Sequence, residues 1–67
     1  MKRRLTVAMS RMSAQEKAAF VLRHFEGMSI AEIGEILELE ASAAKQSVLR
    51  AVRKVRQVLA PAMGMAQ

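Results

Sequence analysis

The stretch from Gly27 to Leu59 constrains the fold most, because it carries two amphipathic helical patterns separated by a very short break. In the first pattern, apolar residues recur at intervals of three or four positions, at Ile30, Ile33, Ile36 and Leu37. In the second, they form one stripe along about five turns, made of Ala44, Val48, Ala51, Val52, Val55 and Leu59. Residues 39–42 leave room for only a tight turn, so the two helices should cross steeply. This is the helix-turn-helix arrangement.

The net charge of +5 is concentrated in the second of these helices. Residues 1–40 contain six basic and six acidic side chains, which cancel. Residues 41–67 contain no acid and all five remaining basic residues, which are Lys45, Arg50, Arg53, Lys54 and Arg56. Such a distribution is typical of a surface that meets a polyanion. Charge alone would also fit a solvated helix, but its combination with a helix-turn-helix pattern favours nucleic acid.

Length and composition exclude several classes of protein. Sixty-seven residues form one domain at most, and a chain of this length buries only about 60% of its unfolded surface. Without cysteine, and with His24 as the single histidine, it offers no disulfide and no zinc site. The longest apolar run, residues 18–22, is far below the ~20 residues of a membrane span, and no signal peptide is apparent. We therefore expect a soluble, cytoplasmic protein without cofactor or membrane contact.

Local signals predict an all-α bundle of four helices. Two Ser-x-x-Glu capping boxes, Ser13 with Glu16 and Ser29 with Glu32, mark the starts of the second and third helices. Pro61 should end the last helix, because proline lacks an N–H and disfavours helix at the preceding residue. The predicted helices span about 5–11, 14–26, 30–38 and 42–60. They form one domain over 5–61, with a basic tail over 1–4 and a frayed end over 62–67.

The second helix should be the most buried element, because apolar residues cover more than half of its circumference. Phe20 and Phe25, the only aromatic residues, are expected in the core. Gly27 supplies a residue that tolerates the left-handed conformation at a helix end. Gly34 costs roughly 1 kcal/mol against alanine inside a helix, and we expect it where the two helices of the motif approach closely.

A helical wheel predicts which face of the last helix meets DNA. In a helix-turn-helix, the N-terminal turns of the second helix enter the major groove. The residues predicted to face the bases are therefore Ser42, Ala43, Lys45 and Gln46. Glutamine can bond adenine, lysine can reach guanine, and a small alanine can lie against a thymine methyl. Further along the helix, Arg50 and Arg53 should contact phosphate, and the amides near Ser29 and Ile30 form a predicted phosphate clamp.

Simpler interpretations compete with some of these assignments. Ser42 could serve only as a helix cap, and Gln46 could simply be solvated. For Lys54 and Arg56 a solvated side chain is the preferred interpretation. The carboxylates of the third helix should turn away from DNA, because they would repel phosphate; they belong to Glu32, Glu35 and Glu38. No nucleophile–base pair or glycine-rich phosphate loop is present, so we do not expect an enzyme.

The segment RHFEGMSIAEIGEILELEASAAKQSVLRAVRKVRQVLAP resembles region 4 of bacterial sigma-70 family sigma factors, especially the extracytoplasmic-function (ECF) type. The resemblance extends over about residues 8–61, and the ending RAVRKVRQVL is similar to one common in that family. It implies contacts with the promoter −35 element from Ser42, Ala43, Lys45, Gln46 and Arg50, with Ser29 at the phosphate clamp. The family often has Gly-Thr-Val where this chain has Ser42, Ala43 and Ala44, so the base preference does not carry over.

The resemblance also implies protein partners. In the family this domain docks on the flap of the β subunit of RNA polymerase and can be occluded by an anti-sigma factor. A complete sigma factor needs a further domain for core binding and −10 melting, so the chain is either part of a longer protein or a free-standing region 4 that works through a partner.

Two alternatives to promoter binding remain open from the sequence. One is a sigma-like module that binds polymerase or an anti-sigma factor and never needs DNA. The other is a response-regulator output domain, a helix-turn-helix group that shares the Gly-x-Ser and Glu-Ile features but usually lacks the basic ending.

Overall fold

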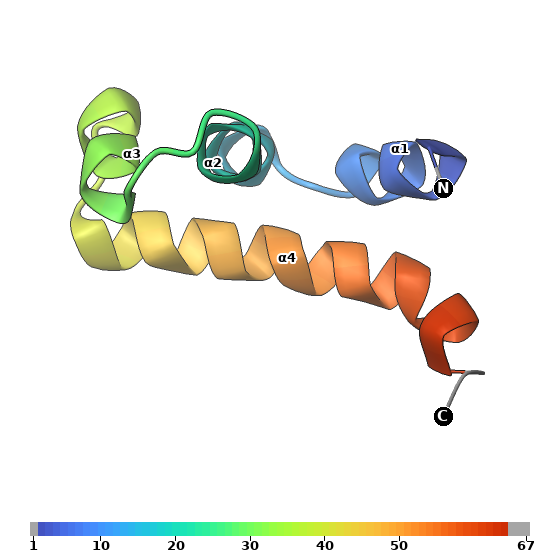
Figure 1. Ribbon diagram of the computed structural model, residues 1–67. Helices are drawn as coiled ribbons and strands as arrows, with labels where there is room; N and C mark the ends of the chain where they lie inside the picture. The colour runs from blue at the N-terminus through green and yellow to red at the C-terminus, as the bar shows by residue number, and fades with distance from the viewer. Residues whose placement is uncertain (1, 65–67) are drawn as a thin grey trace.

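The structure is a computed structural model that describes the backbone of residues 2–64 and the side chains of residues 3–59. These residues form four helices and no strand, which confirms the predicted all-α class (Figure 1). The helices are α1 (Lys2–Ser10), α2 (Ala14–His24), α3 (Ile30–Leu37) and α4 (Ala41–Gly64). At ~1.5 Å per residue, the 24 residues of α4 account for most of the 38 Å length of the molecule.

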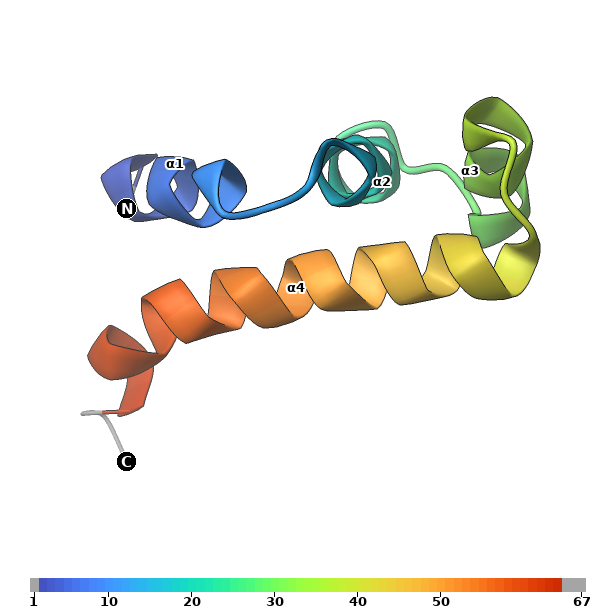
Figure 2. The same ribbon diagram turned by 180° about the vertical axis from the view of Figure 1, so that it is seen from behind.

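The long helix α4 packs against each of the other three helices. Figures 1 and 2 show α1 alongside the C-terminal half of α4, α2 across its middle and α3 over its N-terminal end. Both α2 and α3 cross α4 steeply, as the short turn between α3 and α4 predicts. One side of α4 therefore holds the bundle together, and within residues 2–64 its opposite side carries no other helix.

Two apolar clusters form the core, and both include the predicted stripe of α4. The first joins α2, α3 and α4 through buried Ala19, Ile33, Ala44 and Val48. The second joins α4 to α2 and to the segment after α1 through buried Met12, Phe20 and Ala51, with Leu5 and Met9 of α1 packed against it. Val52 packs against both clusters, so the core is continuous along α4.

Both predicted capping boxes are present, and they fix the starts of α2 and α3. Ser13 Oγ accepts a hydrogen bond from the Glu16 N–H at 3.1 Å, and Glu16 Oε1 accepts one from the Ser13 N–H at 3.0 Å. The corresponding distances for Ser29 and Glu32 are 3.1 and 2.9 Å. Each box satisfies two backbone donors that a helix start leaves without an intrahelical partner. The two helices begin at Ala14 and Ile30, as predicted.

The turn between α3 and α4 explains Gly34 differently from the prediction. A Cβ at this position would lie 2.7 Å from the carbonyl oxygen of Leu39, which belongs to the turn, and 3.8 Å from Ala44 Cβ. The turn is tight because Glu38 takes the left-handed conformation, with φ at 58°, and the Leu39 N–H bonds Gly34 O at 2.7 Å. Glycine is therefore required at position 34 because the Leu39 carbonyl of the turn occupies the space next to a Cβ. The 3.8 Å from that Cβ to Ala44 of α4 is an ordinary van der Waals contact.

Several predicted details are wrong. Pro61 does not end the last helix: α4 continues to Gly64, and Figure 1 shows it changing direction near its C-terminal end, as expected where proline removes a backbone hydrogen bond. At the other end of the chain, α1 begins at Lys2 instead of residue 5. α2 ends at His24, and Phe25 is 62% exposed rather than in the core. Residues 65–67 lie outside the described residues, and the division into a domain over 5–61 and two tails stays a prediction.

Candidate nucleic-acid interface

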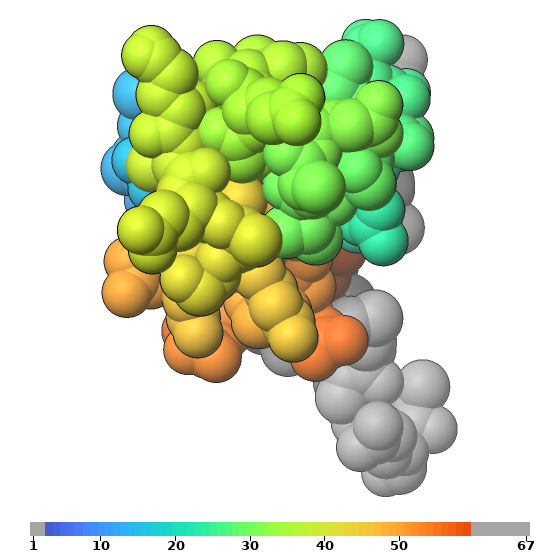
Figure 3. All heavy atoms as spheres, turned by 90° about the vertical axis from the view of Figure 1, so that its left-hand side faces the viewer, coloured from blue at the N-terminus to red at the C-terminus, as the bar shows by residue number. Residues whose placement is uncertain are grey.

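The side of α4 that faces away from the bundle is polar and basic. Its exposed residues include Ser42, Lys45, Gln46, Leu49, Arg50, Arg53 and Arg56, while Ala43 is half-buried. In Figure 3, which looks at the molecule from the α3–α4 turn, α4 (yellow to orange) forms the lower edge. The structure therefore brings six of the seven predicted DNA contacts onto one helix, five of them exposed, and the seventh, Ser29, onto the start of α3.

The start of α4 excludes one of the roles considered for Ser42, that of helix cap. The Ala44 N–H donates to the carbonyl oxygen of Glu40 at 2.9 Å, so helical bonding begins at Glu40. Ser42 therefore lies inside the first turn and is not the cap. Its exposed hydroxyl is carried at the end of α4 that a helix-turn-helix presents to the major groove.

The start of α3 is only partly available as a phosphate clamp. The Ser29 N–H and hydroxyl are both engaged with Glu32. The hydrogen bond from the Ser29 N–H to the Glu32 carboxylate, followed by one with the Ser29 side chain, lowers the pKa of Glu32, so its carboxylate is charged at neutral pH. The amides that the helix itself leaves free are those of Ile30 and Ala31. A phosphate at this clamp would therefore bind those two amides next to a carboxylate.

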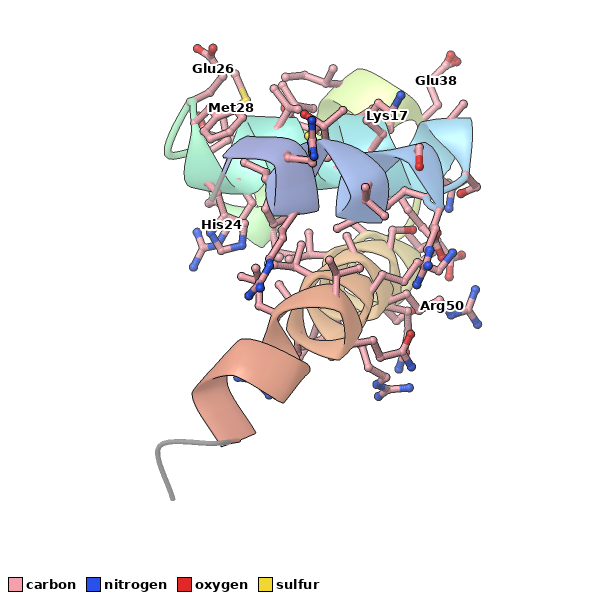
Figure 4. All side chains as sticks on the ribbon, turned by 90° about the vertical axis from the view of Figure 1, so that its right-hand side faces the viewer. Lys17, His24, Glu26, Met28, Glu38 and Arg50 are labelled. Carbon is pink, nitrogen blue, oxygen red and sulfur yellow. The ribbon has the colours of Figure 1, made fainter. Side chains whose placement is uncertain are left out.

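The exposed carboxylates of α3 and the basic side chains of the outward face of α4 lie on different sides of the molecule. Glu32, Glu35 and Glu38 of α3 and its cap are exposed, as predicted. Figure 4 shows Glu38 and Glu26 at the side of the bundle remote from α4, and Arg50 beside α4. Because residues 41–67 contain no acid, the outer face of α4 carries an excess of positive charge, which attracts a polyanion and repels other cations.

Lys54 is not the solvated side chain that the sequence suggested. Its Nζ donates to Glu16 Oε1 at 2.5 Å and to the carbonyl oxygen of Arg11 at 3.0 Å. The hydrogen bond from Lys54 is the main reason that the pKa of Glu16 is lowered, followed by the bond from the Ser13 N–H. Glu16 thus serves both as the capping-box acid of α2 and as the partner of α4, a role that the local sequence motif does not indicate.

A second polar contact, also missed from the sequence, joins α2 to α4. Gln15 Nε2 donates to Ser47 Oγ at 2.7 Å, and the Ser47 hydroxyl donates to the carbonyl oxygen of Ala43 at 3.0 Å. Ser47 is only 3% exposed, so this hydrogen bond is shielded from water. Together with Lys54 and Glu16, this contact fixes the rotation of α4 about its own axis, and so determines which residues face outward.

Comparison with protein families agrees with this geometry. Residues 2–55 match the family model described as sigma-70, region 4. The chain belongs to the sigma-70 region 4 family. Members of this family bind promoter DNA in transcription initiation and are not a catalytic family. A comparison with curated proteins gave no match.

The region 4 domain also has an apolar groove between α2 and α3. It is lined by Ala14, Lys17, Ala18, Val21, Leu22, Ile36 and Leu37. Ile36 is 52% exposed there, so it lies on the surface instead of completing the core, as its place in the helical pattern had indicated. Figure 4 shows Lys17 on the side of the bundle that faces away from α4, so this groove and the basic face of α4 point in different directions.

His24 belongs to a small cluster of aromatic rings in the region 4 domain. Its ring lies 4.7 Å from that of Phe20, measured between centroids, and Phe25 lies 6.1 Å from Phe20 in an edge-on arrangement.

Within residues 2–64, no group of three or more His, Asp or Glu side chains could hold a metal ion. No helix in that part of the chain is long and apolar enough to cross a membrane.

Proposed function

We propose that this region 4 domain recognises the −35 element of promoters, as part of an ECF-type sigma factor acting with RNA polymerase. The single observation that carries the proposal is the outward face of α4, where exposed polar and basic side chains stand without any acidic neighbour on the helix. The family match supports promoter binding, and the ending RAVRKVRQVL supports the ECF type. This function implies that the protein works in the cytoplasm, where the DNA is.

The residues divide into base-facing and phosphate-facing groups by their position on α4. Ser42, Lys45 and Gln46 lie in the first two turns, where side chains can reach base edges. Gln46 would bond adenine in a bidentate manner, Lys45 would reach guanine, and Ala43 would lie near a thymine methyl. The phosphate-facing group consists of Arg50, Arg53 and the start of α3 at Ser29, which would fix the register without reading sequence.

Fluorescence anisotropy can test this division directly. A duplex carrying a −35 element and a scrambled duplex should be titrated with the domain across a salt series. Gln46→Ala should reduce the preference for the −35 duplex by about tenfold, as expected for loss of one bidentate base contact. Arg53→Ala should weaken both duplexes alike and lower the slope of log K against log salt by about 1.

Gln57→Ala is the matched control for Gln46→Ala, because Gln57 is an exposed glutamine far from the N-terminal turns of α4. It should leave the preference unchanged. Equal binding of wild type to both duplexes, lost at physiological salt, would contradict the proposal and leave only a non-specific charged surface.

A second function is favoured by the groove between α2 and α3. An exposed apolar groove on the side away from α4 suits a protein partner, and we infer that this partner is RNA polymerase, through the β flap, or an anti-sigma factor. Ile36→Ser should weaken binding to core polymerase and leave DNA affinity unchanged, because Ile36 is exposed in the groove. If Ile36→Ser binds core polymerase as wild type does, this groove is not the contact.

A further inference from the structure

Leu49 is an apolar residue at the centre of a surface that is otherwise polar and basic. Its side chain is 42% exposed, whereas its neighbour Val48 is 7% exposed. Among the described side chains of α4, Leu49 is the one large apolar side chain that lies on the exposed surface. The apolar residues of α4 that belong to the core clusters pack toward the other helices, and they are Ala44, Val48, Ala51, Val52 and Val55. The position of Leu49 therefore needs a separate explanation.

The helical wheel places Leu49 on the outward face of α4, in the same row as the proposed base contacts. At ~100° per residue, it lies within about 60° of five polar and basic residues of that face, which are Ser42, Lys45, Gln46, Arg53 and Arg56. Arg50 is about 100° away, and Figure 4 shows it projecting to one side of α4. Leu49 follows the proposed base-facing residues Lys45 and Gln46 by four and three positions, so it continues the same row of the helix. Leu49 therefore faces the bases if α4 lies in the groove.

Charge argues for DNA as the group that covers Leu49. An apolar protein surface placed here would have to take Lys45, Arg53 and Arg56 out of water without anionic partners, and burying unpaired charge is strongly unfavourable. DNA instead supplies phosphates for these cations. Within the major groove, the apolar group that base pairs present is the C5-methyl of thymine.

We propose that Leu49 is a specificity-determining residue that packs on the C5-methyl group of a thymine in the promoter site. The proposal rests on the promoter-binding function argued above and adds a base contact beyond the first two turns of α4. Leu49 lies about 4.5 Å further along the helix axis than Gln46, which corresponds to the next one or two base pairs. We therefore predict that the promoter site prefers thymine next to the bases that Gln46 and Lys45 contact.

The test removes the methyl group from DNA and the side chain from the protein separately. The best-binding duplex is first selected from a randomised pool with the wild-type domain, and each thymine is then replaced singly by deoxyuridine. One position should lose about fourfold in affinity, the value expected for one buried methyl group. In Leu49→Ala the same replacement should change affinity by less than about 1.5-fold, because no apolar side chain then meets the methyl.

Val7→Ala is the matched control, since Val7 is a 38%-exposed apolar residue of α1. It should keep the full thymine-to-uracil ratio. Leu49→Ala should also keep the wild-type salt dependence, because phosphate contacts are unchanged. Circular dichroism checks that both variants are helical, and alanine favours a helix at either position.

Each outcome decides the proposal. A thymine-to-uracil ratio that persists in Leu49→Ala, or the absence of any methyl-sensitive thymine in wild type, overturns it while sequence-specific binding itself stands. If the pool yields no preferred sequence, the promoter-binding function fails and the proposal falls with it. If Leu49→Ala lowers affinity for core polymerase and leaves DNA binding unchanged, Leu49 belongs to a protein contact.

Discussion

Replacing Lys54 by methionine should destabilise the domain far more than removing any exposed basic residue of α4. Lys54 Nζ makes two hydrogen bonds, to Glu16 Oε1 and to the Arg11 carbonyl. The Glu16 side chain is only 11% exposed, and that of Lys54 is 32% exposed. Methionine keeps most of the aliphatic length but removes the charge, so Glu16 would be left in a poorly solvated site, still bonded to the Ser13 N–H but without a cationic partner in Lys54.

The size of the effect follows from this intermediate burial. Exposed ion pairs contribute about 0.2–1 kcal/mol, and removing one partner of a buried pair costs about 3–5 kcal/mol. With one partner nearly buried and the other a third exposed, we expect a loss of about 2 kcal/mol. For a domain this small, that corresponds to a fall in Tm of about 8–16 °C. The total free energy of unfolding is only about 3–10 kcal/mol, so the loss is a large fraction of it.

Thermal unfolding followed by circular dichroism at neutral pH measures this directly. Lys45→Met is the control, because it removes the same charge from an exposed site of the same helix and should change stability by no more than about 0.5 kcal/mol. Combining Lys54→Met with Glu16→Gln should recover part of the loss, since the unpaired carboxylate disappears. Equal Tm values for Lys54→Met and Lys45→Met would refute the reasoning, and would mean that the ion pair contributes no more than an exposed one.

Two further predictions concern pH and the turn. The pKa of Glu16 in the folded domain is lowered from its ordinary value of 4.5, so the associated stability is present above that value and is lost as pH falls through the lower, folded pKa. The unfolding temperature should therefore stay level down to about pH 4.5 and then fall. The unfolding temperature of Glu16→Gln, which keeps the capping geometry, should fall less over the same range. Identical pH profiles for the two proteins would count against the ion pair. Gly34→Ala should destabilise by about 1–3 kcal/mol in chemical denaturation, because its Cβ would meet the Leu39 carbonyl oxygen at 2.7 Å; a stabilised variant would show that the turn can relax.

Features that depend on residues close in sequence could be predicted most accurately. The starts of α2 and α3 follow from Ser13 and Ser29, because a capping box is formed by residues three positions apart. The buried stripe of α4 follows from helical periodicity in the same way. In each case the interactions that determine the structure join residues within one or two helical turns, so they can be recognised in the local sequence.

Features that depend on distant partners could not be predicted. Lys54 and Glu16 are 38 positions apart, and Gln15 and Ser47 are 32 apart, so neither contact leaves a local pattern. Phe25 carries an aromatic side chain but follows the last residue of α2, where the chain leaves the core. The wheel could find the outward face of α4, whereas the contacts from α2 that hold α4 at that rotation became visible only in three dimensions.

The arrangement of α4 has a consequence for how promoter preference can evolve. One side of the helix is fixed by packing: Ala44 and Ala51 have no exposed surface, and any larger residue there would push α4 away from its neighbours. The other side carries no structural partner at Ser42, Gln46 and Leu49, and can vary without disturbing the bundle. Under the proposed function, mutation can therefore retarget the domain to a new promoter sequence in single steps, each of which leaves a folded protein for selection to act on.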